Sequence, residues 1–537
     1  MSQSDSADDL DRISAPPPRL THRLFGVSGL GSRWASALRF AAAFAVPASI
    51  AQAVGQGSQA LGIMFGAFLA MYGENRPYRV RWVELSALGA LFLTWVGLGA
   101  GVARSTQEST AALLVMLVVV AAVATFVGHS LMLTPPMGAF AVMLCDVGFS
   151  GVKSGAALAT VLGWPAAGVA GSMVVSMSGW LWHPNKPQQD AVAAAIAAID
   201  RSLERPAVAD RQEATAALVA AWAALHDAGT VAIPEDPLVT ALLAANRRFA
   251  GVVNPDFLPN DTAIPLSRPG PGYLLARTWS PHSRATITTA RLVVAATLAA
   301  VLCTALPLDR PDWAILTVAL VLGGAPARAD GTIRALHRLA GTVLGIGVLG
   351  GLIRLSPSGF WVIVVLTVLL FLIDFLAAGN YALAAAFITP AALLVGVRGD
   401  LTGDLTPLLR DRLLETAIGA ALAIAALWLI APRAHRRGML WMQGRVSAAS
   451  AKLLALLRDT PPDNPRAMRL RRDLQYELAG AAVAITVAAR TEPAWTRTHR
   501  DEYLRRERHG VALLIACWHT PPGHLLTGID ERMPDLP

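Results

Sequence analysis

The sequence is poor in charged residues, and this scarcity excludes an ordinary water-soluble fold. Charged residues make up 15% of its 537 residues, whereas apolar residues make up 54%. Soluble globular domains carry about 25% charged residues, which coat their surface. Only three of the 45 basic residues are lysine, and the net charge is +8. The arginines lie beside apolar runs, so we attribute the basic balance to membrane topology and expect no nucleic-acid partner.

Cysteine and the common catalytic motifs are also scarce. Cys145, Cys303 and Cys517 show no CxxC spacing, which argues against a disulfide framework or a zinc site and favours packing roles. The sequence contains no Walker lysine motif, HExxH, GxSxG or cluster of metal ligands. We therefore expect neither a cofactor nor an enzymatic activity, and we do not expect ATP to drive the protein directly.

Long uncharged runs are abundant, and they predict an all-α polytopic membrane protein with twelve spans. A bilayer core about 30 Å thick needs about 20 residues of helix, and shorter spans also occur. The predicted spans cover residues 38–54, 59–72, 83–103, 111–128, 134–147 and 156–182, then 287–305, 312–326, 339–353, 358–376, 382–397 and 412–431.

The spans form two blocks of six, at residues 38–182 and 287–432, and the blocks resemble each other. In each block the second apolar run breaks into a basic segment, GENRPYRVRW at 73–82 and GGAPARADGTIRALHR at 323–338. We interpret both segments as short arginine-rich turns. Internal repeats of this kind are typical of transporters built from two similar halves.

Arginine placement predicts the orientation of the chain in the membrane. Arginines precede the first span and follow the second, eighth and twelfth, and the positive-inside rule places all of these in the cytoplasm. The loop at residues 398–412 is an exception, because it places three arginines outside. Six spans per block make the two transmembrane repeats parallel, so we expect a solute path at the seam between them.

The polar regions are predicted to be cytoplasmic, as are both termini. Residues 1–37 are expected to form a disordered tail without a cleavable signal peptide. Residues 183–286 and 433–537 contain alanine-rich amphipathic patterns, so each repeat is followed by a helical region whose apolar stripes pack on one another. A Pro- and Gly-rich linker covers residues 254–273.

Arginines of the two basic segments are the first candidates for the solute path. Arg334 and Arg338 are four residues apart and would share a helix face. Guanidinium groups bind carboxylates bidentately, which suits a path for organic anions. The alternative is that these two residues, and likewise Arg76, Arg79 and Arg81, are topology anchors at the lipid headgroups.

Interrupted spans at matching positions in two halves also mark transport sites. The second and eighth predicted spans are short and end in Gly/Pro breaks, while the fifth and eleventh contain proline. Such breaks free backbone groups that must face protein, water or solute. Simple helix termination is the alternative for the second and eighth spans.

Asp374 and His129 are the candidates for proton coupling. Asp374 is the one acid deep in an apolar run, where acids are costly and usually functional. A boundary carboxylate or an ion pair with Arg338 is the alternative. His129 follows the fourth span and would titrate near neutral pH, although a satisfied interfacial histidine is commoner. Trp313 is interpreted as an interface anchor, with stacking on an aromatic solute as the alternative.

The second block resembles the FUSC family, the fusaric acid resistance protein-like proteins that include aromatic acid exporters. The resemblance rests on RPDWAILTVALVL at 310–322, TIRALHRLAGTVLGIGVLGGL at 332–352 and DRLLETAIGAALAIAALWLIAPR at 411–433. The positions that match the family pattern are Trp313, Arg334, Arg338, Gly341, Thr342, Gly345, Arg412, Thr416 and Gly419. The first block keeps the basic segment but lacks the Arg–x–x–x–Arg–x–x–Gly-Thr string.

This resemblance implies an exporter of small organic acids, often aromatic, in the bacterial inner membrane, driven by the proton gradient. It also implies a distant likeness to plant malate channels, which pass organic anions. On this basis Thr342 and Arg412 join Arg334, Arg338 and Trp313 as candidates for the substrate path.

Three functions stay open at this point. The first is a secondary exporter of organic acids, and the second is a passive organic-anion channel with its pore between the two halves. The third is a non-transport scaffold whose helical cytoplasmic regions hold partner proteins. Assembly as a homo-oligomer or with efflux partner proteins is also left open.

Overall fold

The computed structural model describes residues 24, 26, 33–134, 136–204, 208–233, 235–253, 266–324, 327–397, 399 and 404–526. Over these residues the chain is helical and contains no strand, which confirms the predicted all-α fold. Most of the predicted N-terminal tail at 1–37, and most of the predicted linker at 254–273, lie outside the described residues.

Two groups of helices make up the apolar part of the molecule. The first helix block contains α3 (Trp34–Ala53), the short helices η2 (Gln59–Gly62), α4 (Ile63–Ala67) and η3 (Phe68–Met71), then α5 (Tyr78–Ser105), α6 (Thr110–Ser130), α7 (Met137–Lys153), α8 (Leu158–Ser178) and η4 (Gly179–Leu181). The second helix block contains α13 (Arg284–Ala305), α14 (Pro311–Gly323), α15 (Arg328–Leu355), α16 (Phe360–Ala377), α17 (Tyr381–Gly396) and α18 (Thr406–Leu429).

Eight of these helices are long and apolar enough to cross a membrane: α3, α5, α6, α8, α13, α15, α16 and α18. The second and fifth apolar helices of each block are shorter. The 13 residues of α14 span about 20 Å, less than a bilayer core about 30 Å thick. The prediction that the second apolar run of each block is short is therefore confirmed.

The prediction that the basic segments are turns is wrong over most of their length. Helix α5 begins at Tyr78, directly after Pro77, and α15 begins at Arg328. Arg81 and Arg338 are therefore helical, because both helices continue several residues beyond the apolar runs from which the spans were predicted. Only short breaks separate η3 from α5 and α14 from α15.

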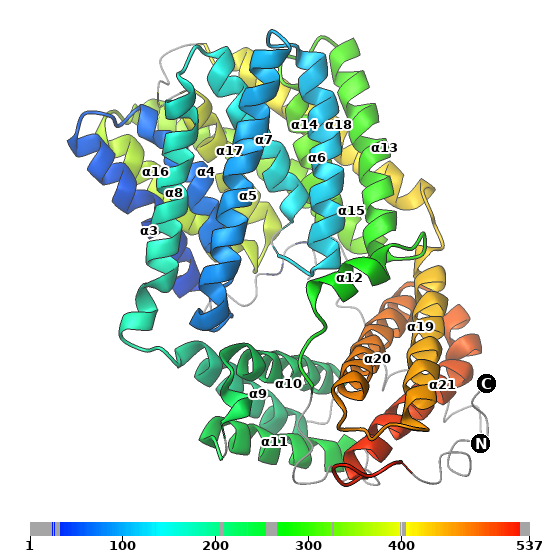
Figure 1. Cartoon of the computed structure of the whole chain (residues 1–537). Helices are drawn as coiled ribbons and strands as arrows, with labels where there is room; N and C mark the ends of the chain where they lie inside the picture. Colours follow the sequence, from blue (N-terminus) through cyan, green and yellow to red (C-terminus); the bar gives the residue numbers. More distant parts are fainter. Residues whose placement is uncertain are drawn as a thin grey trace.

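Helix contacts inside the first block have counterparts inside the second (Figure 1). Helix α5 packs on α7 as α15 packs on α17, and α4 packs on α8 as α14 packs on α18. Contacts between the blocks are also reciprocal, since α3 packs on α16 and α6 packs on α13. One further contact joins α7 to α14 and brings the middle of the first block against the second.

Glycine permits the close contact between α4 and α8. A Cβ at Gly66 of α4 would lie 2.0 Å from the backbone oxygen of Pro165 in α8. A Cβ at Gly168 of α8 would lie 2.1 Å from the backbone oxygen of Ile63. The missing side chains let α4 and α8 approach through their backbones, as small residues do in membrane helix pairs.

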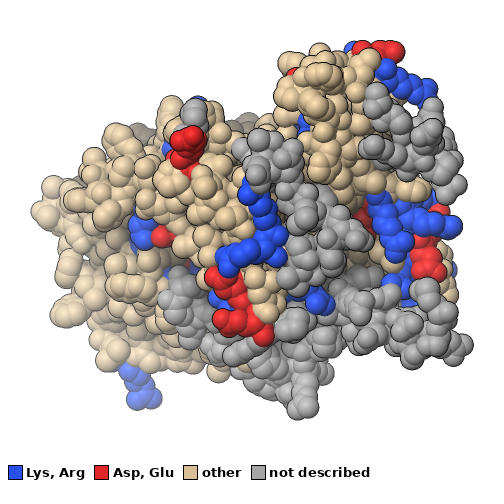
Figure 2. All heavy atoms as spheres, turned by 90° about the horizontal axis from the view of Figure 1, so that it is seen from below, with Lys and Arg blue, Asp and Glu red and all other residues tan. Residues whose placement is uncertain are grey.

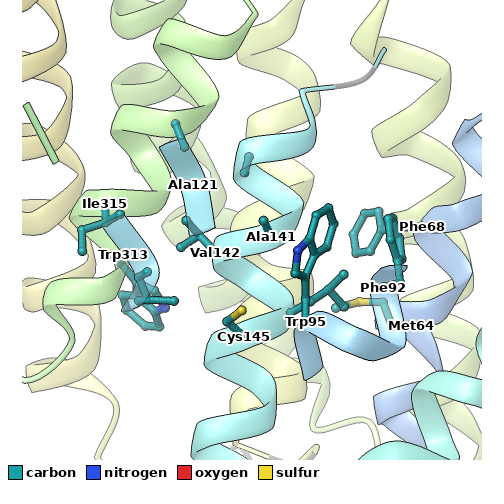
Figure 3. Close-up of a cluster of buried hydrophobic side chains, with 14 of the residues drawn as sticks. Met64, Phe68, Phe92, Trp95, Ala121, Ala141, Val142, Cys145, Trp313 and Ile315 are labelled. Atoms are coloured by element: carbon teal, nitrogen blue, oxygen red, sulfur yellow. The ribbon is translucent and has the colours of Figure 1, made fainter. Parts of the chain in front are cut away.

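One apolar core runs through both blocks. In Figure 3, α7 lies in the middle of this core. Trp313 and Ile315 of α14 lie on one side of α7, and Phe68, Phe92 and Trp95 of the first block lie on the other. The α7–α14 contact therefore joins the two blocks at the level of Trp313.

The remaining helices are α9 (Lys186–Glu204), α10 (Val208–Ala228), η5 (Thr230–Ala232), α11 (Pro237–Val253), α12 (Pro271–Thr278), α19 (Ala434–Leu457), α20 (Pro465–Thr491) and α21 (Pro493–His519). They lie at one end of the apolar blocks (Figure 1). Helices α9 to α11 share apolar cores of their own, as do α19 to α21, so the predicted packing of their apolar stripes is confirmed. Seen from this end, basic and acidic side chains gather side by side (Figure 2).

Candidate functional site

A cavity of about 760 Å³ lies between the two helix blocks. Its walls come from α4, α7 and α8 of the first block and from α14, α15, α17 and α18 of the second. Small-molecule sites in proteins have volumes of about 300–1,000 Å³. We call this space the inter-block cavity, and its position matches the predicted seam between the blocks.

The charged lining of the inter-block cavity is predominantly positive. Four arginines and two aspartates line it: Arg310, Arg334, Arg338, Arg412, Asp146 and Asp312. Four of the sequence candidates, Arg334, Arg338, Arg412 and Trp313, are thus brought together at one site. A surplus of two positive charges among these six residues favours an anion as the occupant.

Arg338 and Arg412 are the most unusual of the lining side chains. Arg338 is fully buried, and none of its three guanidinium nitrogens has a hydrogen-bond partner among the described residues. Arg412 is 1% exposed, and two of its guanidinium nitrogens, Nε and Nη1, also lack one there. A buried charge without a partner costs several kcal/mol. Buried arginines that line a cavity and lack acceptors are suited to a ligand that supplies carboxylate oxygens.

The local structure of α15 explains how Arg338 reaches the cavity. A Cβ at Gly341 would lie 2.5 Å from the backbone oxygen of Ala382, and one at Gly345 would lie 2.8 Å from that of Ala386. These glycines let α15 pack tightly on α17. Thr342 is not among the lining residues of the cavity, and its buried hydroxyl donates to the backbone oxygen of Arg338 at 2.9 Å.

Trp313 provides an aromatic surface beside the charged groups. The guanidinium carbon of Arg412 lies 4.3 Å from the centre of the Trp313 ring, and that of Arg310 lies 4.9 Å from it. Cation–π contacts of this kind help to hold an arginine that has no carboxylate partner. Six aromatic side chains line the cavity in total: Phe65, Phe68, Phe140, Trp164, Trp313 and Tyr381.

Arg334 lies four residues before Arg338 and has different contacts. Its Nε donates to the backbone oxygen of Leu320 at 2.8 Å, and its guanidinium carbon lies 3.9 Å from the centre of the Tyr381 ring. Leu320 belongs to the last turn of α14, whose carbonyl oxygens have no N–H donor within the helix. Arg334 thus caps a helix that ends inside the protein.

An ion-pair network that the sequence candidates did not include joins the two blocks. Arg310 binds Asp146 of α7 at 2.8 Å and Asp312 of α14 at 3.1 Å. The backbone nitrogen of Arg310 donates to Glu415, a fully buried residue of α18, at 2.9 Å. The one available sequence signal was the acidic Asp146 within the apolar run of α7, and nothing in the sequence connects it to a residue 164 positions later.

The arginines of the first basic segment do not line the inter-block cavity. Arg76 binds Glu84 and Asp227, and Arg79 donates to the backbone oxygen of Ala228. Arg81 donates to three backbone oxygens, those of residues 74, 76 and 176. These contacts tie helix ends and α10 together, which favours the anchoring alternative for the first block.

Asp374 and His129 also lie away from this cavity. Asp374 is fully buried and binds Arg33 at 2.9 Å, because α3 packs on α16. The alternative of an ion pair between Asp374 and Arg338 is therefore wrong. His129 lines a second cavity, near the end of the blocks where α9 to α12 and α19 to α21 lie. We call these the soluble helices because they lie outside the two apolar blocks.

Comparison with known proteins identifies one segment of the chain. Residues 294–426 match the family model described as fusaric acid resistance protein-like. No curated protein and no solved structure matches the chain at a significant level. The matched segment covers most of the second helix block, from α13 to α18, and it contains Trp313, Arg338 and Arg412. The predicted family is thereby confirmed for this segment, and the eight long apolar helices make the chain a multi-pass membrane protein.

Proposed function

We propose that the protein is a secondary transporter that exports small aromatic carboxylates across the bacterial cytoplasmic membrane through the inter-block cavity. The observation that carries this proposal is the pair of buried arginines, Arg338 and Arg412, which line the cavity without acceptors for most of their nitrogens. The carboxylate of an aromatic acid would supply those acceptors, and its ring would pack against the apolar side chains that line the cavity.

The helix arrangement supports the proposal. The paired contacts within the blocks are those expected of two parallel six-helix repeats. The soluble helices that follow both blocks lie at the same end, as an even number of crossings per block requires. With both termini in the cytoplasm, the positive-inside rule is met by the arginines at this end. Rocking of one block against the other would then expose the cavity to alternate sides.

The chemistry of the lining fits an aromatic carboxylate. Arginine binds a carboxylate through two parallel hydrogen bonds, and each hydrogen bond to a charged group contributes about 1.5–3 kcal/mol. Trp313 lies within 5 Å of two guanidinium groups, so a ring packed against it would place its carboxylate near them. A single anionic charge would halve the surplus of two positive charges.

Coupling to protons would use the carboxylates near the cavity. Asp146, Asp312 and Glu415 surround Arg310, and protonation of Asp146 would weaken the contact between α7 and the second block. These three residues join Asp374 and His129 as candidates. A passive anion channel is the alternative, and the surplus of fixed positive charge is the observation that favours it.

Binding measurements test the proposed site. In the purified protein, Arg338→Gln and Arg412→Gln should each weaken binding of benzoate more than tenfold, because each removes at least one charge-assisted hydrogen bond. Arg79→Gln is the matched control, since its side chain makes one exposed contact with α10. Unchanged benzoate affinity in both cavity variants would contradict the assignment.

Flux measurements separate a transporter from a channel. In proteoliposomes, a proton-coupled exporter should lose concentrative benzoate transport when an ionophore collapses the pH gradient. A passive channel would carry benzoate down its own gradient at the same rate with or without the ionophore, and that result would contradict coupling.

A further inference from the structure

A second cavity, of about 680 Å³, lies where the helix blocks meet the soluble helices. Its walls come from the ends of α6, α13, α14 and α15, from α12, and from α19 and α20 of the C-terminal region. Among the described residues that line it, none is aspartate or glutamate and five are arginines: Arg277, Arg284, Arg291, Arg328 and Arg334. We therefore call it the arginine cavity.

Most of the contacts of these arginines leave their positive charge uncompensated. Arg291 donates to the backbone oxygens of residues 427, 430 and 431, and Arg328 donates to that of Pro432. Backbone oxygens orient a guanidinium but carry no net charge. Arg277 and Arg284, by contrast, interact with carboxylates, those of Glu477 and Asp330. The cavity therefore attracts anions at the end of the blocks that faces the soluble helices.

Two residues, Pro136 and Arg334, line both cavities. They lie beside Gly323 and Gly324 at the end of α14, where the packing is tight. A Cβ at Gly323 would lie 3.0 Å from the Cβ of Pro136, and one at Gly324 would lie 2.6 Å from the guanidinium carbon of Arg334. Pro136 and Arg334, together with Gly323 and Gly324, separate the inter-block cavity from the arginine cavity. We call these four residues the partition.

Arg334 is the movable part of the partition. Proline is rigid, whereas the half-buried Arg334 side chain is held by one hydrogen bond to the Leu320 backbone oxygen and by the face of Tyr381. An anion that reaches the partition offers the guanidinium a charged acceptor, which is stronger than a backbone oxygen. Rotation of this one side chain would then join the two cavities.

We propose that the arginine cavity is the entry site for the anion from the side of the soluble helices, and that Arg334 is the gate between it and the inter-block cavity. This inference rests on the proposed function, because it names the route by which a carboxylate would reach Arg338. It assigns Arg334 a role distinct from that of Arg338, although the two residues lie on one helix.

Thiol labelling in sealed proteoliposomes tests the gate. The three native cysteines are buried. Gly396→Cys reports on the inter-block cavity and Gly438→Cys on the arginine cavity, and a Cβ at either position meets no atom within 4 Å. The probe is sulfonatoethyl methanethiosulfonate, an anionic reagent that does not cross lipid, added to either side of the vesicles.

With Arg334 intact, reagent on the side of the soluble helices should label Gly438→Cys and spare Gly396→Cys. Arg334→Ala should raise labelling of Gly396→Cys from that side at least tenfold. Gly324→Ala, which displaces the guanidinium and leaves Arg334 in place, should raise it to a smaller extent. Arg354→Ala, at the other end of α15 and in neither cavity, is the matched control and should change nothing.

Unchanged sidedness in both Arg334→Ala and Gly324→Ala would overturn the gate. Labelling of Gly438→Cys from both sides with Arg334 intact would overturn the partition. These outcomes are independent of the proposed function, because labelling requires no transport. Absence of benzoate binding in the same preparations would instead contradict the proposed function, whatever the labelling pattern.

Discussion

Arg338 occupies a position that lowers stability unless a ligand compensates its charge. It is fully buried, and its guanidinium nitrogens have no hydrogen-bond partner in the described part of the chain. Its neighbour Arg412 carries the same charge and interacts with it unfavourably. Binding sites commonly keep such destabilising groups because function requires them.

Substitution of Arg338 by an apolar residue should therefore stabilise the empty protein. Replacing buried charges by apolar residues of similar volume is neutral or stabilising by about 1–4 kcal/mol. We expect Arg338→Met to raise the thermal midpoint in detergent without ligand and to abolish the further rise that benzoate produces in the parent protein. A fall of the midpoint would mean that Arg338 has a structural partner, and would contradict its role as an unfilled anion site.

Trp313 should set the preference for aromatic over aliphatic acids. An aromatic pair contributes about 0.5–1.5 kcal/mol beyond the burial of its area. Trp313→Leu should weaken benzoate binding about threefold to tenfold and leave acetate binding within twofold. Trp361→Leu is the control, because Trp361 is 66% exposed on α16. Equal losses for both acids would contradict stacking on Trp313. Competition binding in the purified protein measures both ratios.

At the scale of single residues, the sequence singled out Arg334, Arg338, Arg412 and Trp313 as candidates. It missed Arg310, Asp146 and Asp312. Arg334 and Arg338 stand out because of their spacing next to an apolar run. Asp146 and Arg310 form an ion pair only because α7 packs on α14, and no local sequence pattern predicts that contact.

At the scale of helices, α15 links the charged site to the packing of the second block. Its cavity-lining arginines and its glycines belong to one continuous helix of 28 residues, although the sequence had suggested a turn before the span. An apolar run predicts which part of a helix is buried, whereas the helix itself continues as long as its backbone hydrogen bonds are made. The boundary error therefore arose where charged residues occupy a helix.

Packing of α15 on α17 predicts a strong effect at Gly345. A Cβ there would lie 2.7 Å from the Cβ of Thr389, so Gly345→Val forces the helices apart. Overpacking of this kind costs about 1–3 kcal/mol. Gly347→Val is the matched control, because a Cβ at Gly347 meets no atom within 4 Å. Thermal unfolding in detergent should show a lower midpoint for Gly345→Val alone, and equal midpoints for the two variants would contradict the tight contact.

At the scale of the whole molecule, the buried carboxylate of Glu477 and the partly exposed carboxylate of Glu492 hold the C-terminal helices together, and Glu477 also binds α12. Burial raises the pKa of Glu477, but hydrogen bonds from Arg445, Arg277 and Tyr273 outweigh this effect and leave the pKa below its usual range. Hydrogen bonds from Arg436 and His435 lower the pKa of Glu492 from 4.5 to about 2.

Both lowered pKa values predict that acid destabilises the packing of the C-terminal helices. A carboxyl whose pKa is lower in the folded state stabilises that state above the unfolded pKa and loses this contribution as the pH falls through the folded value. The hydrogen-exchange protection factors of residues 434–526 in the full chain, which correct for the pH dependence of intrinsic exchange, should therefore fall between about pH 4.5 and pH 2.

Glu477→Gln should accelerate the same exchange already at pH 7. Loss of one partner of a buried ion pair costs about 3 kcal/mol. Glu502→Gln, which removes an exposed pair with Arg506, is the control and should leave exchange unchanged. Equal protection of Glu477→Gln and the parent protein at pH 7 would contradict the role of Glu477.

The arrangement of the two blocks could be predicted only in part. The even number of predicted spans per block and the repeated basic segments indicated that the solute path lies at the seam between the blocks. A cavity lies there. The position of the arginine cavity could not be predicted, because it depends on how α19 and α20 dock beneath the blocks.

The most direct test of the account is a structure determined with 4-iodobenzoate, whose iodine marks the position and orientation of the ligand. The account predicts one molecule in the inter-block cavity, with its carboxylate within hydrogen-bond distance of Arg338 or Arg412 and its ring beside Trp313. At saturating ligand, an iodine signal confined to other sites, or none in this cavity, would contradict the proposal that these buried arginines bind the transported anion.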